Sequence, residues 1–438
     1  MNDLPAAFLE EMRAQLGSEM PAFEAACAGE ALRGVRLNPL KKPAHLLPEG
    51  LGEPVPWCPD GYYLSTESRC GLQVLHEAGA WYLQEPSAML PAQVLHVRPG
   101  ETVLDLCSAP GGKTTQMAAA MQGRGLLVAN EIVPKRAQIL SRNVERMGVP
   151  NALVISSDAE KLALRWPEAF DAVLVDAPCS GEGMFRRHPE TRGEWSPESV
   201  QGCSARQKEI LSCAARMVRG GGRLVYSTCT MNRFENEDNV DWFLKKHPDF
   251  ELRPFELPGA DGREGMLTCY PHRIRGEGQF AALFVRKDGE TRPLEGNLRC
   301  TEEKAVRRAM EQAVHTAPDT LFALGDTFFS LPGCPDLRGL RVLRAGVHLG
   351  EIRKGIFTPD HAWAVSTLAP DVERVEIREV EARRYLQGET LTVDSGRGYV
   401  LPCFDGLALG WGKVTDTVLK NHYPKGLRRA VNAADAES

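Results

Sequence analysis

The sequence predicts an α/β fold built around a doubly wound, mostly parallel sheet. From about residue 101, short apolar runs alternate with helical segments, which is the pattern of such a sheet. The runs predicted as strands read TVLDL, GLLVANE, NALVISSD, FDAVLVDAP, GGRLVYSTC and, later, FAALFVRK. Between them, KTTQMAAAMQ, PKRAQILSRNVERMG and PESVQGCSARQKEILSCAARMVRGGG have the Ala, Leu and Gln content and the closing glycines that suit helices. Open sheets of this kind bind ligands beyond the carboxyl ends of their strands.

The 438 residues, 43% of them hydrophobic, are enough for several domains. Apolar residues from Leu4 to Leu16 recur at helical spacing and predict an opening amphipathic helix. The next stretch, GVRLNPLKKPAHLLPEGLGEPVPWCPDGYYL, is rich in Pro and Gly and is predicted to break regular structure. A polar segment near 287–305 is interpreted as a linker, followed by a mixed region and a Gly-rich, β-leaning end. We therefore expect four units, with the limits 1–92, 93–287, 300–375 and 376–438.

The composition excludes some classes of protein. The formal charge of −6 gives no overall polycation, so contact with a nucleic acid would depend on local basic patches. No apolar run approaches the length of a membrane span and the N-terminus has no signal pattern, so we expect a soluble, cytoplasmic protein with no membrane partner. The 12 cysteines form no C-x-x-C pair, which argues against a metal site. Most of them are interpreted as small buried apolar residues.

The loop DLCSAPGGKTT, residues 105–115, resembles a phosphate-binding loop at first sight. A Walker A motif needs a glycine five residues before Gly112, and that position is Cys107. The G-x-G-x-x-G spacing of dinucleotide enzymes is also missing. What remains is a strand, a tight turn and a helix start, in which Gly111 and Gly112 let a ligand approach the backbone.

Acidic residues follow three of the predicted strands. Glu131, Asp158 and Asp176 end the second, third and fourth runs, so they are expected to converge on one crevice with the glycine loop. Glu131 could accept both hydroxyls of a ribose, and Asp158 is available to an adenine amino group. This describes a nucleoside pocket without a phosphate clamp, into which S-adenosylmethionine fits. Alternatively, such acids cap the following helix or face water.

Two cysteines follow neighbouring runs, Cys179 in DAPCSGEGMFRR and Cys229 in YSTCT. Carbon 5 of cytosine is a poor nucleophile until a thiolate adds to carbon 6, so a thiol at this crevice suits methylation of cytosine. A protonated Asp176 could hydrogen-bond the ring nitrogen and stabilise the adduct. A base must afterwards remove the proton from carbon 5. This chemistry alone does not explain a second cysteine.

These motifs give the chain a family resemblance. The set CSAPGGK, Glu131, Asp158, DAPCSGEGMFRR and STCT resembles the RsmB/RsmF (Sun) family of RNA cytosine-C5 methyltransferases. The segments LPAAFLEEMRAQLG, RLNPLKK, HEAGAWYLQEPSAML, PHRIRGEGQFAALFVRK and LGWGKVTDTVLKNHYPKGLRRA resemble its RsmF branch, whereas the region from about 300 to 375 does so less clearly.

The resemblance implies a Rossmann-like class I methyltransferase sheet with an N-terminal α/β RNA-binding extension and a C-terminal PUA-like β-rich domain. It implies Cys229 as the nucleophile and Cys179 as the residue that assists product release, with Asp176 as the third catalytic candidate. The cofactor contacts that it implies are Cys107, Ser108, Ala109, Pro110, Gly111, Gly112, Lys113, Glu131, Arg136, Asp158 and Asp176.

The implied function is S-adenosylmethionine-dependent formation of 5-methylcytosine in small-subunit (16S) ribosomal RNA, free or in the ribosomal subunit, by a monomer. The target base would have to leave its stack to reach the thiol. The residues able to contact phosphates are Arg36, Lys41, Lys42, Arg186, Arg187, Lys420, Lys425, Arg428 and Arg429, and those able to stack on bases are Tyr62, Tyr63 and Tyr423.

Other interpretations stay open at this point. The segment GEGMFRRHPE is interpreted as a substrate-facing lid, although it could be a plain loop in which Met184 and Phe185 pack. A non-catalytic ribosome-assembly protein that binds RNA on a methyltransferase-like fold is the alternative function. Intact Cys179, Cys229 and Asp176 argue against it. A nicotinamide-dependent reductase is disfavoured because the dinucleotide glycine spacing is missing.

Overall fold

The computed structural model describes residues 4–428 with the exception of 295, 297–298 and 334. At its centre lies a nine-stranded sheet with the strand order β10-β14-β9-β8-β5-β6-β7-β17, in which β13 pairs with β14. Its five parallel strands are β5 (Thr102–Asp105), β6 (Leu126–Asn130), β7 (Ala152–Ser156), β8 (Phe170–Asp176) and β9 (Val218–Thr228). The chain passes from β5 outward to β7 and then returns to β8 on the other side of β5. This reversal puts the switch point, where doubly wound sheets bind ligands, between β5 and β8.

Antiparallel strands extend the sheet at both edges. Beyond β9 lie β14 (Gln279–Arg286), β10 (Phe250–Leu252) and β13 (Met266–Cys269). At the opposite edge β17 (Arg341–Ala345) pairs with β7. The region 300–375, expected to form a unit of its own, therefore contributes one strand to the central sheet. The limits of the four units remain predictions.

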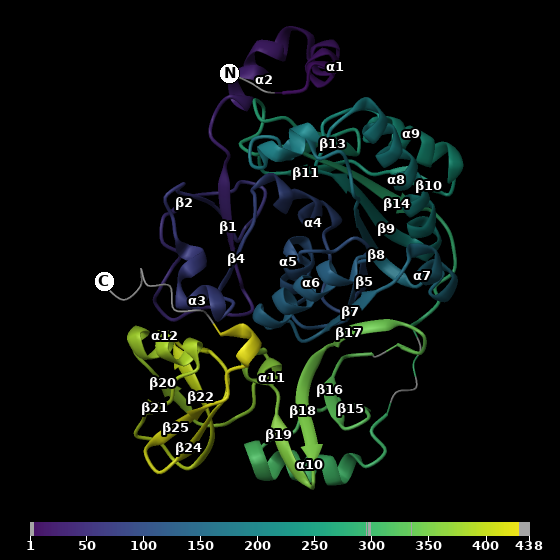
Figure 1. The fold of residues 1–438 in the computed structure, drawn as a ribbon. Helices are drawn as coiled ribbons and strands as arrows, with labels where there is room; N and C mark the ends of the chain where they lie inside the picture. The colour runs from purple at the N-terminus through teal and green to yellow at the C-terminus, as the bar shows by residue number, and fades with distance from the viewer. Residues whose placement is uncertain (1–3, 295, 297–298, 334, 429–438) are drawn as a thin grey trace.

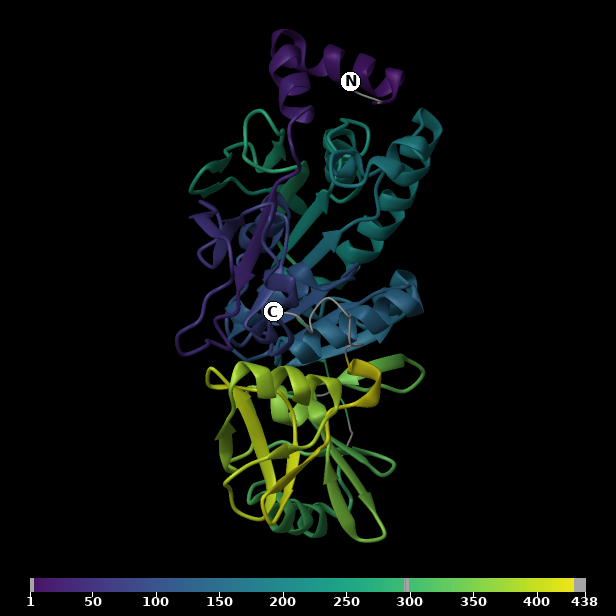
Figure 2. The same ribbon diagram turned by 60° about the vertical axis from the view of Figure 1, so that its left-hand side comes forward.

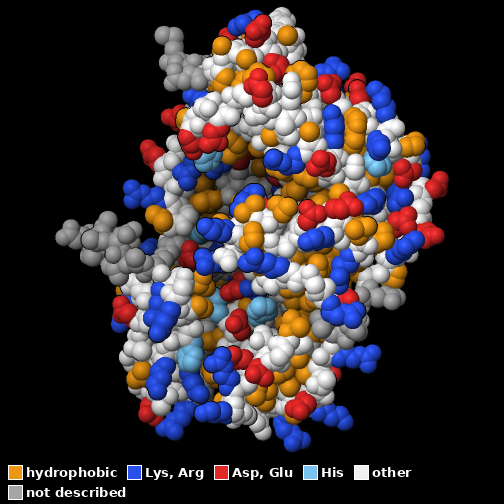
Figure 3. All heavy atoms as spheres, turned by 45° about the vertical axis from the view of Figure 1, so that its right-hand side comes forward, with side chains coloured by type: hydrophobic (Ala, Val, Ile, Leu, Met, Phe, Trp, Pro, Cys, Tyr) orange, Lys and Arg blue, Asp and Glu red, His pale blue; other side chains and the backbone are white. Residues whose placement is uncertain are grey.

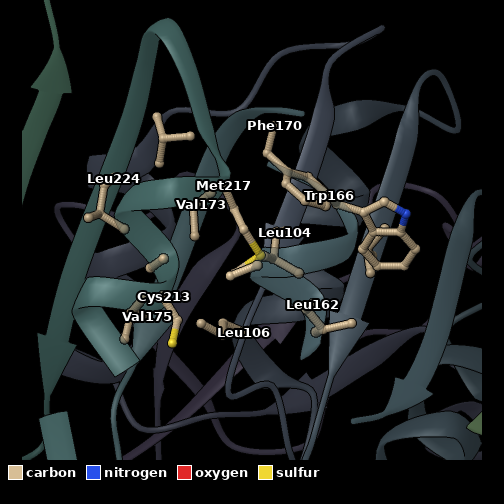
Figure 4. Close-up of a cluster of buried hydrophobic side chains, with 14 of the residues drawn as sticks. Leu104, Leu106, Leu162, Trp166, Phe170, Val173, Val175, Cys213, Met217 and Leu224 are labelled. Atoms are coloured by element: carbon tan, nitrogen blue, oxygen red, sulfur yellow. The ribbon is translucent and has the colours of Figure 1, made fainter. Parts of the chain in front are cut away.

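Helices cover both faces of the sheet (Figure 1). One face packs against α4 (Leu90–Leu95), α5 (Gly112–Met121) and α6 (Pro134–Arg146). The other packs against α7 (Ala159–Arg165), α8 (Pro197–Met217) and α9 (Glu237–Lys246). Figure 4 shows part of this second layer, where Leu104, Val173 and Leu224 of the sheet meet Leu162 and Met217 of the helices. These apolar contacts on both sides explain why the parallel strands read as nearly continuous hydrophobic runs.

The first hundred residues begin with two helices, α1 (Ala6–Leu16) and α2 (Met20–Cys27), which confirm the predicted amphipathic opening. A four-stranded sheet follows, with β1 (Arg33–Leu37), β2 (Leu51–Pro54), β3 (Gly61–Leu64) and β4 (Trp81–Leu83) in the order β2-β3-β1-β4. The prediction that residues 34–64 break regular structure is therefore wrong for three short strands. The prolines are compatible with them because they fall in the connections or, as Pro54 does, at the end of an edge strand. A short helix, α3 (Val74–Glu77), precedes β4.

After the linker, α10 (Glu303–Val314) leads into a sheet of β15 (Phe322–Leu324), β16 (Thr327–Ser330), β18 (Val347–Arg353) and β19 (Ile356–Pro359). Next comes α11 (His361–Val365). The last sheet contains β20 (Arg374–Glu376), β21 (Leu391–Thr392), β22 (Gly398–Phe404), β23 (Leu407–Ala408), β24 (Gly412–Thr415) and β25 (Val418–Asn421), with α12 (Glu379–Gln387) inserted. The β-rich C-terminus is thereby confirmed.

The N-terminal sheet and the C-terminal sheet pack together although the sequence separates them widely. Figure 1 shows α3 beside α12, and Figures 1 and 2 both show α1 and α2 at the end of the molecule away from the C-terminal sheet. A shared cluster joins Trp81 and Val35 to Tyr385, Leu386 and Leu419. In addition, the Lys41 ammonium donates a hydrogen bond to the Val365 carbonyl. Within the described part of the chain, none of the helices combines the length and apolar character needed to cross a bilayer.

Candidate active site

The glycine loop between β5 and α5 is held in shape by neighbouring strands and helices. The Ser108 hydroxyl donates to the Asn130 carbonyl at 2.7 Å, and Arg136 of α6 donates to the Ala109 carbonyl at 3.0 Å. Gly111 has a φ of 112°, a value that favours glycine, and a Cβ there would come within 3.1 Å of Leu140. The Ser108 hydroxyl is therefore already paired within the protein. A ligand at this loop would contact the backbone of the loop and the start of α5.

Asp105 is a further candidate site residue, which was not among those predicted from the sequence. It ends β5 and is buried, and its Oδ2 accepts a hydrogen bond of 2.6 Å from the Thr114 hydroxyl. Its Oδ1 is buried with no hydrogen-bond partner among the described residues. Burial raises the pKa of this carboxyl to about 7. Its place at the end of the first strand, directly before the glycine loop, is the same signal that identified the other acids.

Glu131 and Asp158 follow their strands as predicted, but in different surroundings. Glu131 is buried, with Oε1 accepting from the Val133 amide at 2.9 Å and Oε2 paired with Arg136 at 3.2 Å. Arg136 thereby connects this acid to the glycine loop. Asp158 is exposed and caps α7, its Oδ1 accepting from the Glu160 amide at 2.9 Å. The helix-capping alternative is therefore correct for Oδ1 of Asp158. Contact between Asp158 and a cofactor remains a prediction.

Lys113 and Asp176 form an ion pair at the switch point. The Lys113 ammonium lies 2.7 Å from Asp176 Oδ2, and the Ser227 hydroxyl donates to Oδ1 at 2.6 Å. Burial opposes the charge of Lys113, but Asp176 and, to a smaller extent, Cys229 outweigh it, so the pKa of Lys113 is raised. Both oxygens of Asp176 therefore have a hydrogen-bond donor beside them. The ammonium thus lies between the glycine loop and the cysteines.

The two cysteines lie together, as the predicted adjacency of their strands implies. The sulfur atoms of Cys179 and Cys229 are 3.2 Å apart, and β8 and β9 run side by side and parallel. The hydrogen bond to Cys229, together with burial, raises the pKa of the Cys179 thiol well above its usual range. At this distance either thiol could donate to the other sulfur, so the pair can share a proton.

Several residues proposed to contact RNA prove to be internal. Arg36 is buried and donates to the Gly112 carbonyl and the Thr115 hydroxyl, Lys41 is buried against backbone carbonyls, and Arg186 pairs with buried Glu277. Tyr63 and Tyr423 are buried as well, so they present no face to a base. The predictions for the four buried residues are wrong because hydrogen-bond acceptors and apolar neighbours surround their side chains, whereas Arg186 is partly exposed and its contact with RNA stays a prediction.

The other candidates are more accessible. Exposed residues are Lys42, Arg187, Lys420 and Lys425, whereas Tyr62 and Arg428 are partly exposed and Arg429 lies outside the described residues. Figure 3 shows one face of the molecule, on which Lys and Arg side chains alternate with acidic and apolar ones. On this face the basic groups are distributed rather than gathered in a single patch.

The segment predicted as a lid is partly packed against the N-terminal helices. Phe185 is buried, and its ring contacts that of Phe8 with 5.2 Å between centroids. Met184 is only partly buried. The packing alternative is therefore correct for Phe185. Because Cys179 lies two residues before this segment, α1 indirectly supports the cysteine pair.

The geometry fits S-adenosylmethionine better than a polyphosphate. Three acids, Asp105, Glu131 and Asp176, surround the glycine loop, and Asp105 still has an unpaired buried oxygen. Such a ring of carboxylates favours a ligand with cationic groups and repels phosphates. The fold and the site together define a class of protein, the S-adenosylmethionine-dependent methyltransferases with a Rossmann-like sheet.

Comparisons with known proteins are more specific. Residues 92–285 match the family described as 16S rRNA methyltransferase RsmB/F, and residues 4–86 match the N-terminal domain of 16S rRNA methyltransferase RsmF. Residues 303–366, which lie in the region where the sequence resemblance was less clear, match the first C-terminal domain of RsmF rRNA methyltransferase. Residues 372–429 match the RsmF PUA domain.

Whole-chain relatives agree. Ribosomal RNA small subunit methyltransferase F from Cronobacter sakazakii is 34% identical, over 97% of this chain and 96% of that protein. Its counterpart from Shewanella oneidensis is 34% identical over 95% of each chain. This chain belongs to the RsmF family of 16S rRNA methyltransferases, whose methyl donor is S-adenosylmethionine.

Solved structures share the fold. A methyltransferase homologue from Pyrococcus horikoshii is 26% identical with a TM-score of 0.53, covering 65% of this chain and all (100%) of that one. NSun6 from Pyrococcus horikoshii, at 20% identity and a TM-score of 0.55, covers 65% of this chain and 98% of its own, and shows the fold alone.

Proposed function

We propose that this protein methylates carbon 5 of a cytosine in small-subunit ribosomal RNA through a covalent bond between Cys229 and carbon 6. The observation that carries the proposal is the 3.2 Å contact between the Cys179 and Cys229 sulfurs, beside the Lys113–Asp176 ion pair and the glycine loop. A structural thiol needs no acidic partner, no nearby ammonium and no position at the switch point. A nucleophilic thiol, in contrast, is favoured by a nearby cation, and Lys113 is close enough to Cys229 for the two charges to interact.

The residues divide the reaction among them. Cys229 attacks carbon 6, the new C–S bond forms, and the electron pair displaced from the ring makes carbon 5 nucleophilic. Asp176, protonated as expected from the sequence, would donate a hydrogen bond to the ring nitrogen and offset the charge that this addition creates. The bound cofactor supplies a methyl group on a positively charged sulfur. A base then takes the proton from carbon 5, the electron pair of that C–H bond returns to the ring, and the C–S bond breaks to release Cys229 as a thiolate.

Cys179 is assigned to the release step. Its thiol lies 3.2 Å from the sulfur that has to leave, and its raised pKa keeps a proton available there. A hydrogen bond to the departing thiolate lowers the barrier for breaking the C–S bond. The pair thus accounts for the second cysteine that pyrimidine chemistry alone did not require.

The cofactor contacts proposed from the sequence remain part of this assignment. The backbone from Cys107 to Lys113 would hold the methionine end, Glu131 the ribose and Asp158 the adenine, with Arg136 fixing Glu131. Asp105, with its free Oδ1, is added as a partner for the cofactor's ammonium group.

The proposed substrate follows from the relatives, which are named for the small ribosomal subunit. A cytosine must leave its stack before carbon 6 can approach Cys229. The match to an RsmF PUA domain and the exposed Lys42, Arg187, Lys420 and Lys425 support contact with RNA. We infer that the enzyme acts in the cytoplasm, where its substrate is found, as a monomer. The non-catalytic RNA-binding alternative gives no reason for the paired cysteines.

Transfer of tritium from labelled S-adenosylmethionine into 16S RNA tests the proposal. Parent protein is expected to incorporate label into 5-methylcytosine, and Cys229→Ala to incorporate none because carbon 6 has no nucleophile. Cys179→Ala is expected to accumulate a protein–RNA adduct that survives denaturation. Normal methylation by Cys229→Ala would contradict the covalent mechanism, and the absence of any methylation by the parent would favour the binding protein.

A further inference from the structure

The two loops that carry the cysteines are joined by a buried polar network. The Cys179 loop (residues 177–187) contributes Glu182, and the Cys229 loop (residues 229–236) contributes Glu235. Both carboxylates are almost completely buried, with exposed fractions of 2% and 0%. Buried carboxylates are costly unless donors satisfy their oxygens. Their contacts therefore show what each one holds.

Each carboxylate binds the backbone of the opposite loop. Glu182 Oε2 accepts hydrogen bonds of 2.9 Å from the amides of Met231 and Asn232. Glu235 Oε2 accepts one of 3.1 Å from the amide of Ser180, the residue that follows Cys179. The relation is reciprocal, since each cysteine loop is held by an acid from the other. We call Glu182 and Glu235 the carboxylate clamp.

Further bonds tighten the clamp around the two sulfurs. The Asn232 side-chain amide lies 2.9 Å from Glu182 Oε1 and 2.8 Å from Glu235 Oε1, so it bridges the two acids. Gln207 donates to Glu235 at 2.6 Å and to the Pro178 carbonyl at 3.0 Å. The peptides on both sides of Cys179 are thus tied, directly or through Gln207, to Glu235.

We propose that Glu182 and Glu235 are positioning residues that fix the spacing of Cys179 and Cys229, and thereby the proton donation between them. This inference rests on the proposed function for its catalytic consequence, but the geometry that it claims can be measured without catalysis. A network of this kind holds reacting groups within fractions of an ångström of productive geometry.

Replacement by glutamine removes one acceptor without changing the size of the side chain. Both oxygens of Glu182 and both of Glu235 accept hydrogen bonds, whereas glutamine has one accepting oxygen. Glu182→Gln and Glu235→Gln each leave a buried donor unpaired at the opposite loop. Thr230→Val is a milder variant, which removes the 3.0 Å contact between the Ser180 and Thr230 hydroxyls and the 2.9 Å hydrogen bond that Asn232 donates to the Thr230 hydroxyl, but leaves both carboxylates in place.

Disulfide formation by diamide measures the sulfur spacing in the full-length protein. Diamide takes up the two electrons and two protons that leave the thiols, its N=N bond becomes an N–N bond bearing two hydrogens, and an S–S bond forms. Mass spectrometry of the Cys179–Cys229 peptide gives the rate. We expect each glutamine variant to form the disulfide about tenfold more slowly than the parent, and Thr230→Val to show a smaller decrease.

The same variants are then assayed for RNA methylation. We expect kcat to fall about tenfold in both glutamine variants, with KM for RNA changed by less than about twofold, because spacing rather than binding is lost. Glu237→Gln is the matched control. Glu237 lies two residues from Glu235 and is also partly buried, but its carboxylate accepts from Thr268 and contacts neither cysteine loop backbone.

The outcomes separate the two proposals. Clamp variants that form the disulfide at the parental rate overturn the clamp, whatever their activity, and so do variants that form it slowly but methylate normally. Parental behaviour of Glu237→Gln, with both rates lowered in the clamp variants, supports it. If instead Cys229→Ala methylates RNA normally, the covalent mechanism fails while the disulfide rates still report on the spacing.

Discussion

At the scale of single residues, the site depends on charges placed close together in a buried setting. Lys113 pairs with Asp176 and also lies near enough to Cys229 for that sulfur's charge to raise its pKa. The cofactor end and the nucleophile end of the crevice are therefore electrostatically connected by one ammonium. Glu11 of α1 extends this connected set outward, because the charges of Glu182 and Glu235 act on it.

The first prediction concerns the pH dependence of stability. Burial, helped by the charges of Glu182 and Glu235, raises the pKa of Glu11 from 4.5 to about 7. The folded protein thus binds this proton more tightly than the unfolded chain, so this contribution is present below about pH 4.5 and is lost as the pH rises toward 7. Glu11→Gln is expected to raise the free energy of unfolding at pH 8 by roughly 1 kcal/mol, after discounting for partial exposure.

Urea unfolding of parent and variant from pH 4 to 8 checks this expectation. Glu10→Gln is the matched control, since Glu10 is exposed on the same helix. Parallel pH profiles for the parent and Glu11→Gln would contradict the assignment.

At the scale of elements, the N-terminal helices act on the cysteine loops through packing. Phe8 of α1 contacts Phe185 and Trp195 with centroid separations of 5.2 Å and 5.9 Å. The Gln15 amide donates to the Met231 carbonyl at 3.0 Å, which connects α1 to the Cys229 loop as well. Helix α1 therefore packs against both loops that carry the carboxylate clamp.

Removing the Phe8 ring is predicted to loosen this arrangement. Phe8→Ala should lower the free energy of unfolding by about 3–5 kcal/mol, because a large buried aromatic side chain is lost. Hydrogen exchange should quicken in residues 181–195, and methylation should slow with it. Unchanged exchange in that segment would show that α1 does not support it.

The elements also show what can be predicted from sequence. The parallel strands and the meeting of Cys179 with Cys229 were predictable, because residues that follow neighbouring parallel strands meet at one edge. Strand β17 was not, because it joins the sheet from about two hundred residues away along the chain. Glu182 and Glu235 follow the same two strands but were not predicted, because the sequence does not show how the loops turn or which backbone amides the carboxylates reach. Arg36 and Lys41 were misassigned because a sequence does not show which cations are buried.

At the scale of the whole molecule, Asp405 connects the loop between β1 and β2 to the C-terminal sheet. Its carboxylate Oδ2 accepts from the amides of His45 and Leu46 at 3.0 Å and 2.8 Å, and its carbonyl accepts from the Ala44 amide. Asp405 lies in the turn between β22 and β23 and has a φ of 49°. The loop between β1 and β2 is thus ordered by the C-terminal sheet.

Asp405→Ala is predicted to release that loop. Loss of a charged acceptor should cost about 1–3 kcal/mol of stability and make residues 38–49 sensitive to limited proteolysis. Asp405→Asn retains one accepting oxygen and tolerates the turn's positive φ, so it should restore most of the protection. Equal cleavage of the parent and Asp405→Ala would contradict the proposed role of Asp405 in holding this loop.

The apolar cluster shared by Trp81 and Val35 with Tyr385 and Leu419 has a consequence for biosynthesis. While the ribosome is still translating the segment before Ile377, the first sheet has emerged without the surface that shields it. The apolar face of the first sheet stays exposed to water until the C-terminal sheet has been synthesised and has folded against it. Chains that end before the C-terminal sheet should therefore be bound by chaperones and degraded by proteases, even when they contain every residue of the catalytic crevice.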